Sequence, residues 1–82
     1  MGSKMMTIRL KNINDVKAFN EAALLCNSEM YIRQGRYVVD AKSIMGIFSL
    51  NLLEDLYLEI YEHENGEALD FVETIKKLGI IK

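Results

Sequence analysis

Hydrophobic and polar residues alternate along four short stretches of the chain, which is the pattern of β-strands with one buried face. Every second residue is apolar in the first stretch, residues 6–10, and in the last, residues 56–61. Two middle stretches, residues 30–33 and 38–41, lie on either side of Gly35. Glycine tolerates the positive φ that tight turns often need, so these two stretches predict a hairpin. The alternation therefore predicts four strands.

Apolar residues recur at intervals of three and four in three other stretches, which predicts three helices with one buried face each. The first helix is expected over residues 15–27, after a polar segment that can cap it. The second covers residues 43–50, with Ser43 as its N-cap. The third places five apolar residues on one side: Ala68, Phe71, Val72, Ile75 and Leu78. The order β-α-β-β-α-β-α predicts a two-layer α/β (α+β) sandwich, with the helices covering one face of an antiparallel sheet.

The length of the chain, 82 residues, allows one hydrophobic core and therefore one domain. We expect residues 4–82 to form this single domain. The first three residues, Met1 to Ser3, have the character of a start-site or cloning remnant, and we expect them to lie outside the fold.

Charge and composition exclude several classes of function. A net charge of −2 argues against a nucleic-acid binder, and no apolar run approaches the roughly 20 residues that span a membrane. Cys26 is the only cysteine and has no Cys or His near it, so we expect no internal disulfide and no metal site, which fits a reducing cytoplasm. We also expect no cofactor. Residues 1–42 hold seven Lys or Arg and four Asp or Glu, whereas residues 43–82 hold three and eight. The surface is therefore expected to be polarised, either as ordinary solvation charge or to steer a partner.

One segment carries a specific family resemblance. The run Lys42-Ser43-Ile44-Met45-Gly46, followed by two apolar residues, a serine and a leucine, resembles the regulatory-serine segment of HPr phosphocarrier proteins of the bacterial sugar phosphotransferase system. The similarity extends over nearly the whole chain in the order and length of the elements. It implies an open-faced β-sandwich with strand order 1-4-2-3 and three helices on one face. It also implies docking of partner proteins through the first two helices.

The residues that carry phosphate in that family are missing. HPr proteins hold a His-Ala-Arg-Pro motif at the start of the first helix, where enzyme I phosphorylates the imidazole. Counting back from Ser43 without gaps places Asn12 at the histidine position, Asn14 at the arginine and Asp15 at the proline. An asparagine amide cannot act as the nucleophile, so we expect no carrier activity. No catalytic constellation indicates an enzyme of another kind.

His63 is the only histidine in the chain, and a displaced acceptor there would restore a carrier function. Glu62 and Glu64 flank it and Glu67 follows, so a phosphoryl group would meet like charge. We interpret His63 as an exposed loop residue. A phosphocarrier with this unconventional acceptor stays as an alternative.

Ser43 has two interpretations. As an N-cap it contributes about 1 kcal/mol whether or not it is ever modified. The family resemblance implies regulatory phosphorylation at this serine, which would add a charge of about −2 at the start of the second helix, beside Lys42.

Ile44, Met45 and Phe48 are expected to form an exposed apolar patch for docking partners, together with Lys42. Leu52 and Leu53 are expected to widen the patch, whereas Ile47 and Leu50 are expected to point toward the sheet. The competing interpretation is that the patch residues belong to the hydrophobic core.

The leading hypothesis is an HPr-like regulatory or adaptor protein. The resemblance implies an HPr serine kinase and a carbon-catabolite transcription regulator as partners. The alternative from another class is a structural binding module that forms a homodimer through the patch.

Overall fold

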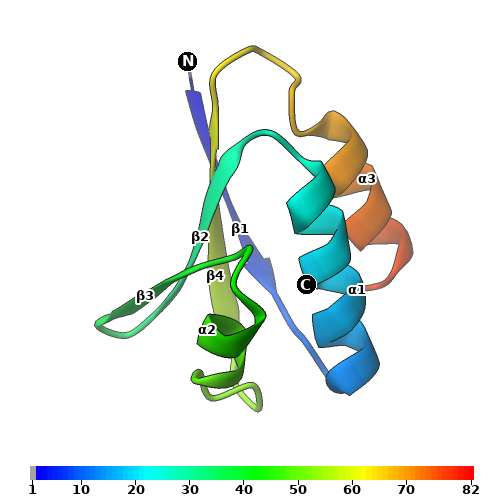
Figure 1. Cartoon of the computed structure of the whole chain (residues 1–82). Coiled ribbons are helices and arrows are strands. Elements are labelled where there is room, and N and C mark those ends of the chain that lie inside the picture. The colour runs from blue at the N-terminus through cyan, green and yellow to red at the C-terminus, as the bar shows by residue number, and fades with distance from the viewer. Residues whose placement is uncertain (1) are drawn as a thin grey trace.

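Three helices cover one face of a four-stranded antiparallel sheet (Figure 1). The computed structural model of the protein describes residues 2–82. The elements, in chain order, are β1 (Gly2–Ile8), α1 (Ile13–Leu25), β2 (Glu29–Gln34), β3 (Tyr37–Asp40), α2 (Ile44–Phe48), β4 (Leu56–Glu62) and α3 (Leu69–Lys77). The strand order is β1-β4-β2-β3. The predicted open-faced sandwich and its strand order are confirmed.

Strand β4 lies at the centre of the sheet and supplies the middle of the core. Leu56, Leu58 and Ile60 are fully buried on its inner face. Leu58 lies opposite Met6 of β1 and Ile32 of β2, so the inward positions of three strands come into register. This arrangement follows from the alternation in the sequence, because a strand with period two buries one complete face.

Helices α1 and α3 pack their apolar stripes onto the sheet and against each other. The ring of Phe19 on α1 meets the ring of Phe71 on α3 edge to face, with 5.6 Å between the centroids. Helix α1 begins two residues earlier than expected, because Asn12 caps it. The prediction that Leu78 is buried is wrong. Leu78 follows the last residue of α3 and is 44% exposed, and Ile80 fills the core after the turn at Gly79.

The first strand begins earlier than the sequence pattern indicates. Gly2 pairs with Glu62 and Ser3 with Tyr61, so these two residues extend β1 instead of lying outside the fold. Backbone pairing needs no apolar side chain, and the hydrophobic pattern therefore carries no signal for it. Met1, the other residue expected outside the fold, lies outside the described residues.

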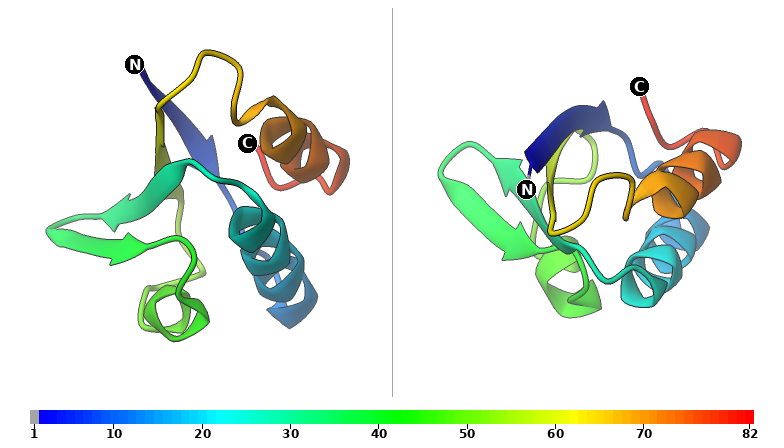
Figure 2. Two further views of the ribbon diagram at one scale, coloured as in Figure 1. Left: turned by 45° about the horizontal axis from the view of Figure 1, so that its top comes forward. Right: turned by 90° about the horizontal axis from the view of Figure 1, so that it is seen from above.

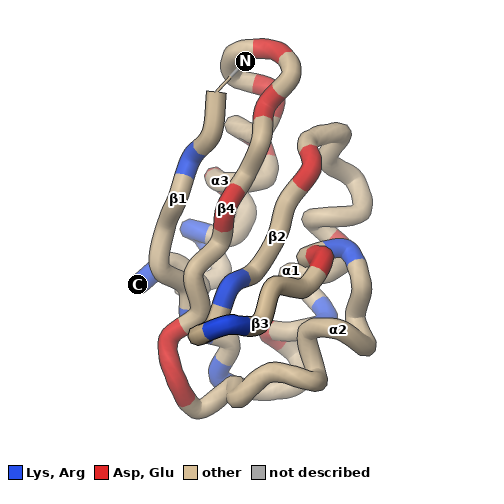
Figure 3. Tube along the Cα trace, turned by 90° about the vertical axis from the view of Figure 1, so that its left-hand side faces the viewer, with Lys and Arg blue, Asp and Glu red and all other residues tan. Residues whose placement is uncertain are grey.

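Basic and acidic residues from the two halves of the chain lie on neighbouring strands of the sheet (Figure 3). Because β4 pairs with both β1 and β2, acidic residues of the second half face basic residues of the first. On the open face Arg33 Nε lies 2.9 Å from Glu59 Oε1. On the opposite, helix-covered face Lys4 Nζ lies 3.8 Å from Oε1 of the buried Glu62. The charge difference between the halves therefore does not separate into two faces on the sheet.

No helix within residues 2–82 is long and apolar enough to cross a membrane.

Candidate functional site

Two hydrogen bonds that involve Asp15 close the start of α1. Asp15 donates its backbone N–H to Asn12 Oδ1 over 2.8 Å, and Lys11 donates its backbone N–H to Asp15 Oδ2 over 3.0 Å. Residues 12–15 thus offer two amides and a carboxylate, whereas a phosphoryl acceptor needs a nucleophile and positive charge. Asn14, which the gapless alignment predicts to replace the family arginine, is an exposed neutral side chain.

The spacing typical of a helix cap is present in the sequence, because Asp15 follows Asn12 by three residues. The polar residues predict a cap, whereas the role of the Asp15 carboxylate, which accepts from the backbone N–H of Lys11, is seen only in the structure. Asp15 places a negative charge in the first turn of α1, and the helix dipole stabilises negative charge at this N-terminal end. A second anion at the same place would be repelled.

Ser43 caps α2 as predicted. Its Oγ accepts a hydrogen bond from the backbone N–H of Gly46 over 3.2 Å, and the side chain is exposed. Asp40 fixes the loop before it, accepting from the backbone N–H groups of Lys42 and Ser43. The exposed hydroxyl therefore lies in an ordered connection between β3 and α2.

Gly46 is the residue that lets α2 approach β3. A Cβ atom built on Gly46 would lie 3.3 Å from both Ser43 Oγ and Val39 Cβ. A side chain there would crowd the capping serine and the neighbouring strand, which explains a glycine inside a short helix.

Lys42 connects α2 to the end of α1. Its Nζ donates to the carbonyl oxygen of Cys26 over 2.6 Å, and the side chain is half-buried. The ammonium group expected to dock partners is thus engaged with the backbone of the same molecule.

Two of the predicted patch residues are strongly exposed. Met45 is 77% exposed and Phe48 42% exposed, and we name these two residues the α2 patch. Ile44 and Leu52 are half-buried against the core, and Ile47 is fully buried. The patch is therefore narrower than the sequence predicted, because Ile44 turns toward the core.

Leu53 does not extend the α2 patch. Leu53 is exposed, and its carbonyl oxygen accepts a hydrogen bond from Arg9. It lines a separate hollow together with Tyr57 and Lys82.

His63 lies among carboxylates. Its backbone N–H donates to Glu67 Oε2 over 3.3 Å, and Glu62, the preceding residue, accepts from the backbone N–H of Ala68 over 2.8 Å. A hydrogen bond from Ser28, 2.6 Å long, lowers the pKa of the Glu67 carboxyl, which keeps it charged. Negative charge next to His63 opposes a phosphoryl group.

No group of three or more His, Cys, Asp or Glu side chains that could hold a metal ion occurs in the part of the chain that the structure describes.

The strand order β1-β4-β2-β3 and the three helices on one face make up an HPr-like fold. Two solved structures share the architecture. HPr-C-His from Thermoanaerobacter tengcongensis superposes with a TM-score of 0.67, at 22% identity, over 95% of this chain and 90% of that chain. The phosphocarrier protein HPr from Bacillus anthracis str. Ames gives a TM-score of 0.65, at 25% identity, over 89% and 94%. The resemblance found in the sequence is thus confirmed as a resemblance of fold.

The likeness is structural. No protein-family model and no curated protein matches the chain in sequence.

Proposed function

We propose that this protein is a regulatory or adaptor protein related to the phosphoenolpyruvate-dependent sugar phosphotransferase system, without histidine phosphocarrier activity and without enzymatic activity. The observation that carries the proposal is the pair formed by Asn12 and Asp15 at the start of α1. Phosphate transfer to a carrier requires a neutral imidazole nitrogen and donors for the phosphoryl oxygens. The HPr-like fold with this substitution supports a protein that keeps the scaffold and lacks the transfer chemistry.

The regulatory event we propose is phosphorylation of Ser43 by a kinase of the HPr serine kinase type. The exposed hydroxyl and its ordered loop support this, because a kinase needs an accessible acceptor in a fixed position. A phosphate would add about −2 charge beside the exposed apolar side chain of Met45. The modification would therefore alter a docking surface while leaving the buried core unchanged.

The α2 patch is the surface we propose for a protein partner in the cytoplasm, such as a transcription regulator of carbon catabolism. Methionine adapts its shape to a partner and phenylalanine contributes a large rigid area. A negative charge on Ser43 would attract a partner bearing arginine and repel an acidic one.

The proposal is tested by mass spectrometry of the intact protein. One sample is incubated with an HPr serine kinase and ATP, and another with enzyme I and phosphoenolpyruvate. We expect one phosphoryl group from the kinase and none from enzyme I. Ser43→Asn should abolish the kinase product, and it keeps a capping side chain, so loss of label cannot be attributed to a damaged helix.

Ser49→Ala is the matched control, because Ser49 is an exposed serine at the C-cap of the same helix, where its hydroxyl donates to the carbonyl oxygen of Gly46. It should be phosphorylated like the wild type. An acid-labile label from enzyme I that disappears in His63→Gln would instead establish the carrier alternative. If no kinase labels the protein and it forms a dimer that Phe48→Asp disrupts, the self-associating module is the correct interpretation.

A further inference from the structure

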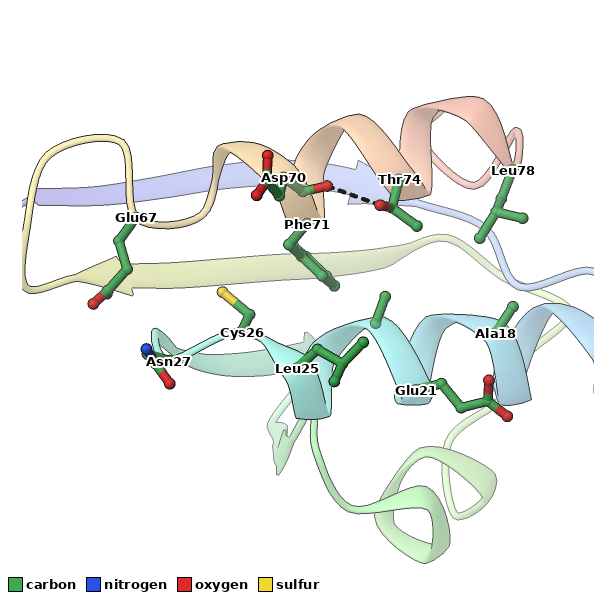
Figure 4. A pocket seen from close by; sticks show the side chains of 11 residues that line it. Ala18, Glu21, Leu25, Cys26, Asn27, Glu67, Asp70, Phe71, Thr74 and Leu78 are labelled. Carbon is green, nitrogen blue, oxygen red and sulfur yellow. Dashed lines mark hydrogen bonds between the residues drawn. The ribbon is translucent and has the colours of Figure 1, made fainter.

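A groove runs between α1 and α3, with a volume of about 570 Å³ (Figure 4). Its apolar lining includes Ala18 and Ala22 from α1 and Phe71 from α3. Leu25 is 88% exposed at one side of it, and Leu78 at the other end is 44% exposed. These are large apolar side chains that the fold leaves in water.

The groove exists because α1 presents small side chains to α3. Ala18 and Ala22 are four residues apart and therefore lie on one face of the helix. Phe71 closes the bottom, since its ring packs on Phe19 and is almost fully buried. Above this aromatic contact no large side chain fills the space between α1 and α3. The result is a groove with an apolar floor.

The rim of the groove is acidic. Glu21 on α1 and Glu67 and Asp70 at the start of α3 line it, and no lysine or arginine does. Glu67 is held in its charged form, because the hydroxyl of Ser28 donates to it and lowers its pKa.

Among residues 2–82, no lysine or arginine forms an ion pair with the three carboxylates of this rim. His63 and Lys42 act on the charge of Glu67 from outside the groove, and the ammonium of Lys42 is hydrogen-bonded to the Cys26 carbonyl. Lys76 and Lys77 lie in the last turn of α3 and are not lining residues. A ligand in the groove would therefore meet an apolar floor between carboxylates.

We propose that this groove docks a positively charged amphipathic helix of a partner protein. The apolar stripe of such a helix would cover Ala22 and Phe71, which is the helix-in-groove mode of recognition. Its lysines or arginines would face Glu21 and Asp70 across the rim. Helix α1 has 13 residues and is about 20 Å long, so a partner helix of similar length fits along it.

This site is separate from the surface proposed above. Helix α1 contacts α2 on one side and α3 on the other (Figure 2). The α2 patch and the groove therefore lie on different sides of α1.

The test uses a synthetic peptide of about 14 residues, with leucine at helical spacing and lysine elsewhere. One control peptide has the same composition in scrambled order, and a second replaces lysine with glutamate. Binding is followed by NMR titration of isotope-labelled protein at low and high salt. We expect shifts at Ala22, Leu25 and Phe71 with the cationic amphipathic peptide, weaker binding at high salt, and neither effect with the control peptides.

Paired variants distinguish binding in the groove from non-specific electrostatic or hydrophobic attraction. Asp70→Lys should weaken binding about fivefold, whereas Glu73→Lys, which changes the net charge equally on the same helix but outside the groove, should change it less than about twofold. Leu25→Asn should likewise weaken binding about fivefold, and Leu24→Asn, an exposed neighbour outside the groove, should not. Thermal melts check that all four variants fold.

Three results would overturn the proposal. The first is a set of shifts centred on Met45 and Phe48 instead of the groove. The second is equal weakening by Asp70→Lys and Glu73→Lys, which would indicate non-specific attraction. The third is a homodimer of the free protein that buries Leu25. None of these results bears on phosphorylation of Ser43, so failure here and failure of the proposed function are distinguishable.

Discussion

Asn12 and Ser43 occupy equivalent places at the starts of two helices. Each accepts a hydrogen bond from a backbone N–H in the first turn, over 2.8 Å from Asp15 and over 3.2 Å from Gly46. Structurally the two caps are interchangeable, since asparagine and serine rank together at this position. Chemically they differ, because a hydroxyl accepts a phosphoryl group from a kinase and an amide accepts none.

The cap at Ser43 gives a prediction for stability. Ser43→Ala should lower the free energy of unfolding by about 1 kcal/mol, because the N–H of Gly46 loses its acceptor. Ser43→Asn should stay within about 0.5 kcal/mol of the wild type. Urea denaturation followed by circular dichroism measures both. Equal stability of the alanine variant and the wild type would mean that the cap contributes nothing.

Whether the role of a residue can be predicted from the sequence depends on how far along the chain its contacts reach. Caps are local, so the positions of Asn12 and Ser43 could be predicted from their neighbours alone. The contact from Lys42 to Cys26 could not, because it joins residues 16 positions apart through a long flexible side chain. The burial of Ile44 depends in the same way on how α2 is oriented over the core.

At the scale of elements, the period of the apolar residues predicted every helix and strand. That period is reliable here because each element buries a single face. The ends are where expectation and structure differ: β1 reaches back to Gly2 through backbone pairing, and α3 stops before Leu78. Neither end is specified by a repeating apolar position.

The hairpin between β2 and β3 gives a prediction about its turn. Gly35 has φ of 61°, in the left-handed region, and a Cβ atom there would touch nothing. Gly35→Ala should therefore destabilise the protein through backbone strain alone, by about 1 kcal/mol. Gly35→Asn should cost less, because asparagine enters this region more readily. Denaturant titrations of both variants provide the measurement, and a larger loss for asparagine than for alanine would contradict the explanation.

At the scale of the whole molecule, features arise that no local pattern contains. The mixing of charge on the sheet follows from the central place of β4, and the groove follows from the distance between α1 and α3. In the sequence Ala18 and Ala22 are ordinary helix formers. They become the floor of a hollow only when Phe71 is placed opposite them by the packing of α3.

Three distant segments meet at Asp55, just before β4. Lys82 Nζ lies 2.8 Å from Asp55 Oδ2, and Arg9 Nη1 lies 3.1 Å from Asp55 Oδ1. The backbone supports the same junction, since Lys82 donates its N–H to the carbonyl oxygen of Thr7 over 3.0 Å. The ion pairs thus join the end of β1, the start of β4 and the segment after α3.

This junction predicts how stability depends on pH. Hydrogen bonding to Lys82, and the charges of Lys82 and Arg9, lower the pKa of the Asp55 carboxyl from its ordinary value of 3.8. A carboxyl with a depressed pKa in the folded state binds protons more readily when unfolded, so its contribution to stability is complete above pH 3.8 and is lost as the pH falls through the folded value. Asp55→Asn should therefore be less stable than the wild type at neutral pH, and the difference should shrink in acid.

Urea denaturation of both proteins from pH 7 down to about pH 2 measures that difference. Some acid sensitivity will persist in the variant, because the pKa values of Glu59 and Glu67 are also lowered by their partners. Glu54→Gln is the matched control: this neighbouring carboxylate accepts a hydrogen bond from the neutral amide of Asn51, and its replacement should leave the slope with pH unchanged. A difference between Asp55→Asn and the wild type that is the same at every pH would mean that Asp55 stabilises the junction by hydrogen bonding alone, and that its charge contributes nothing.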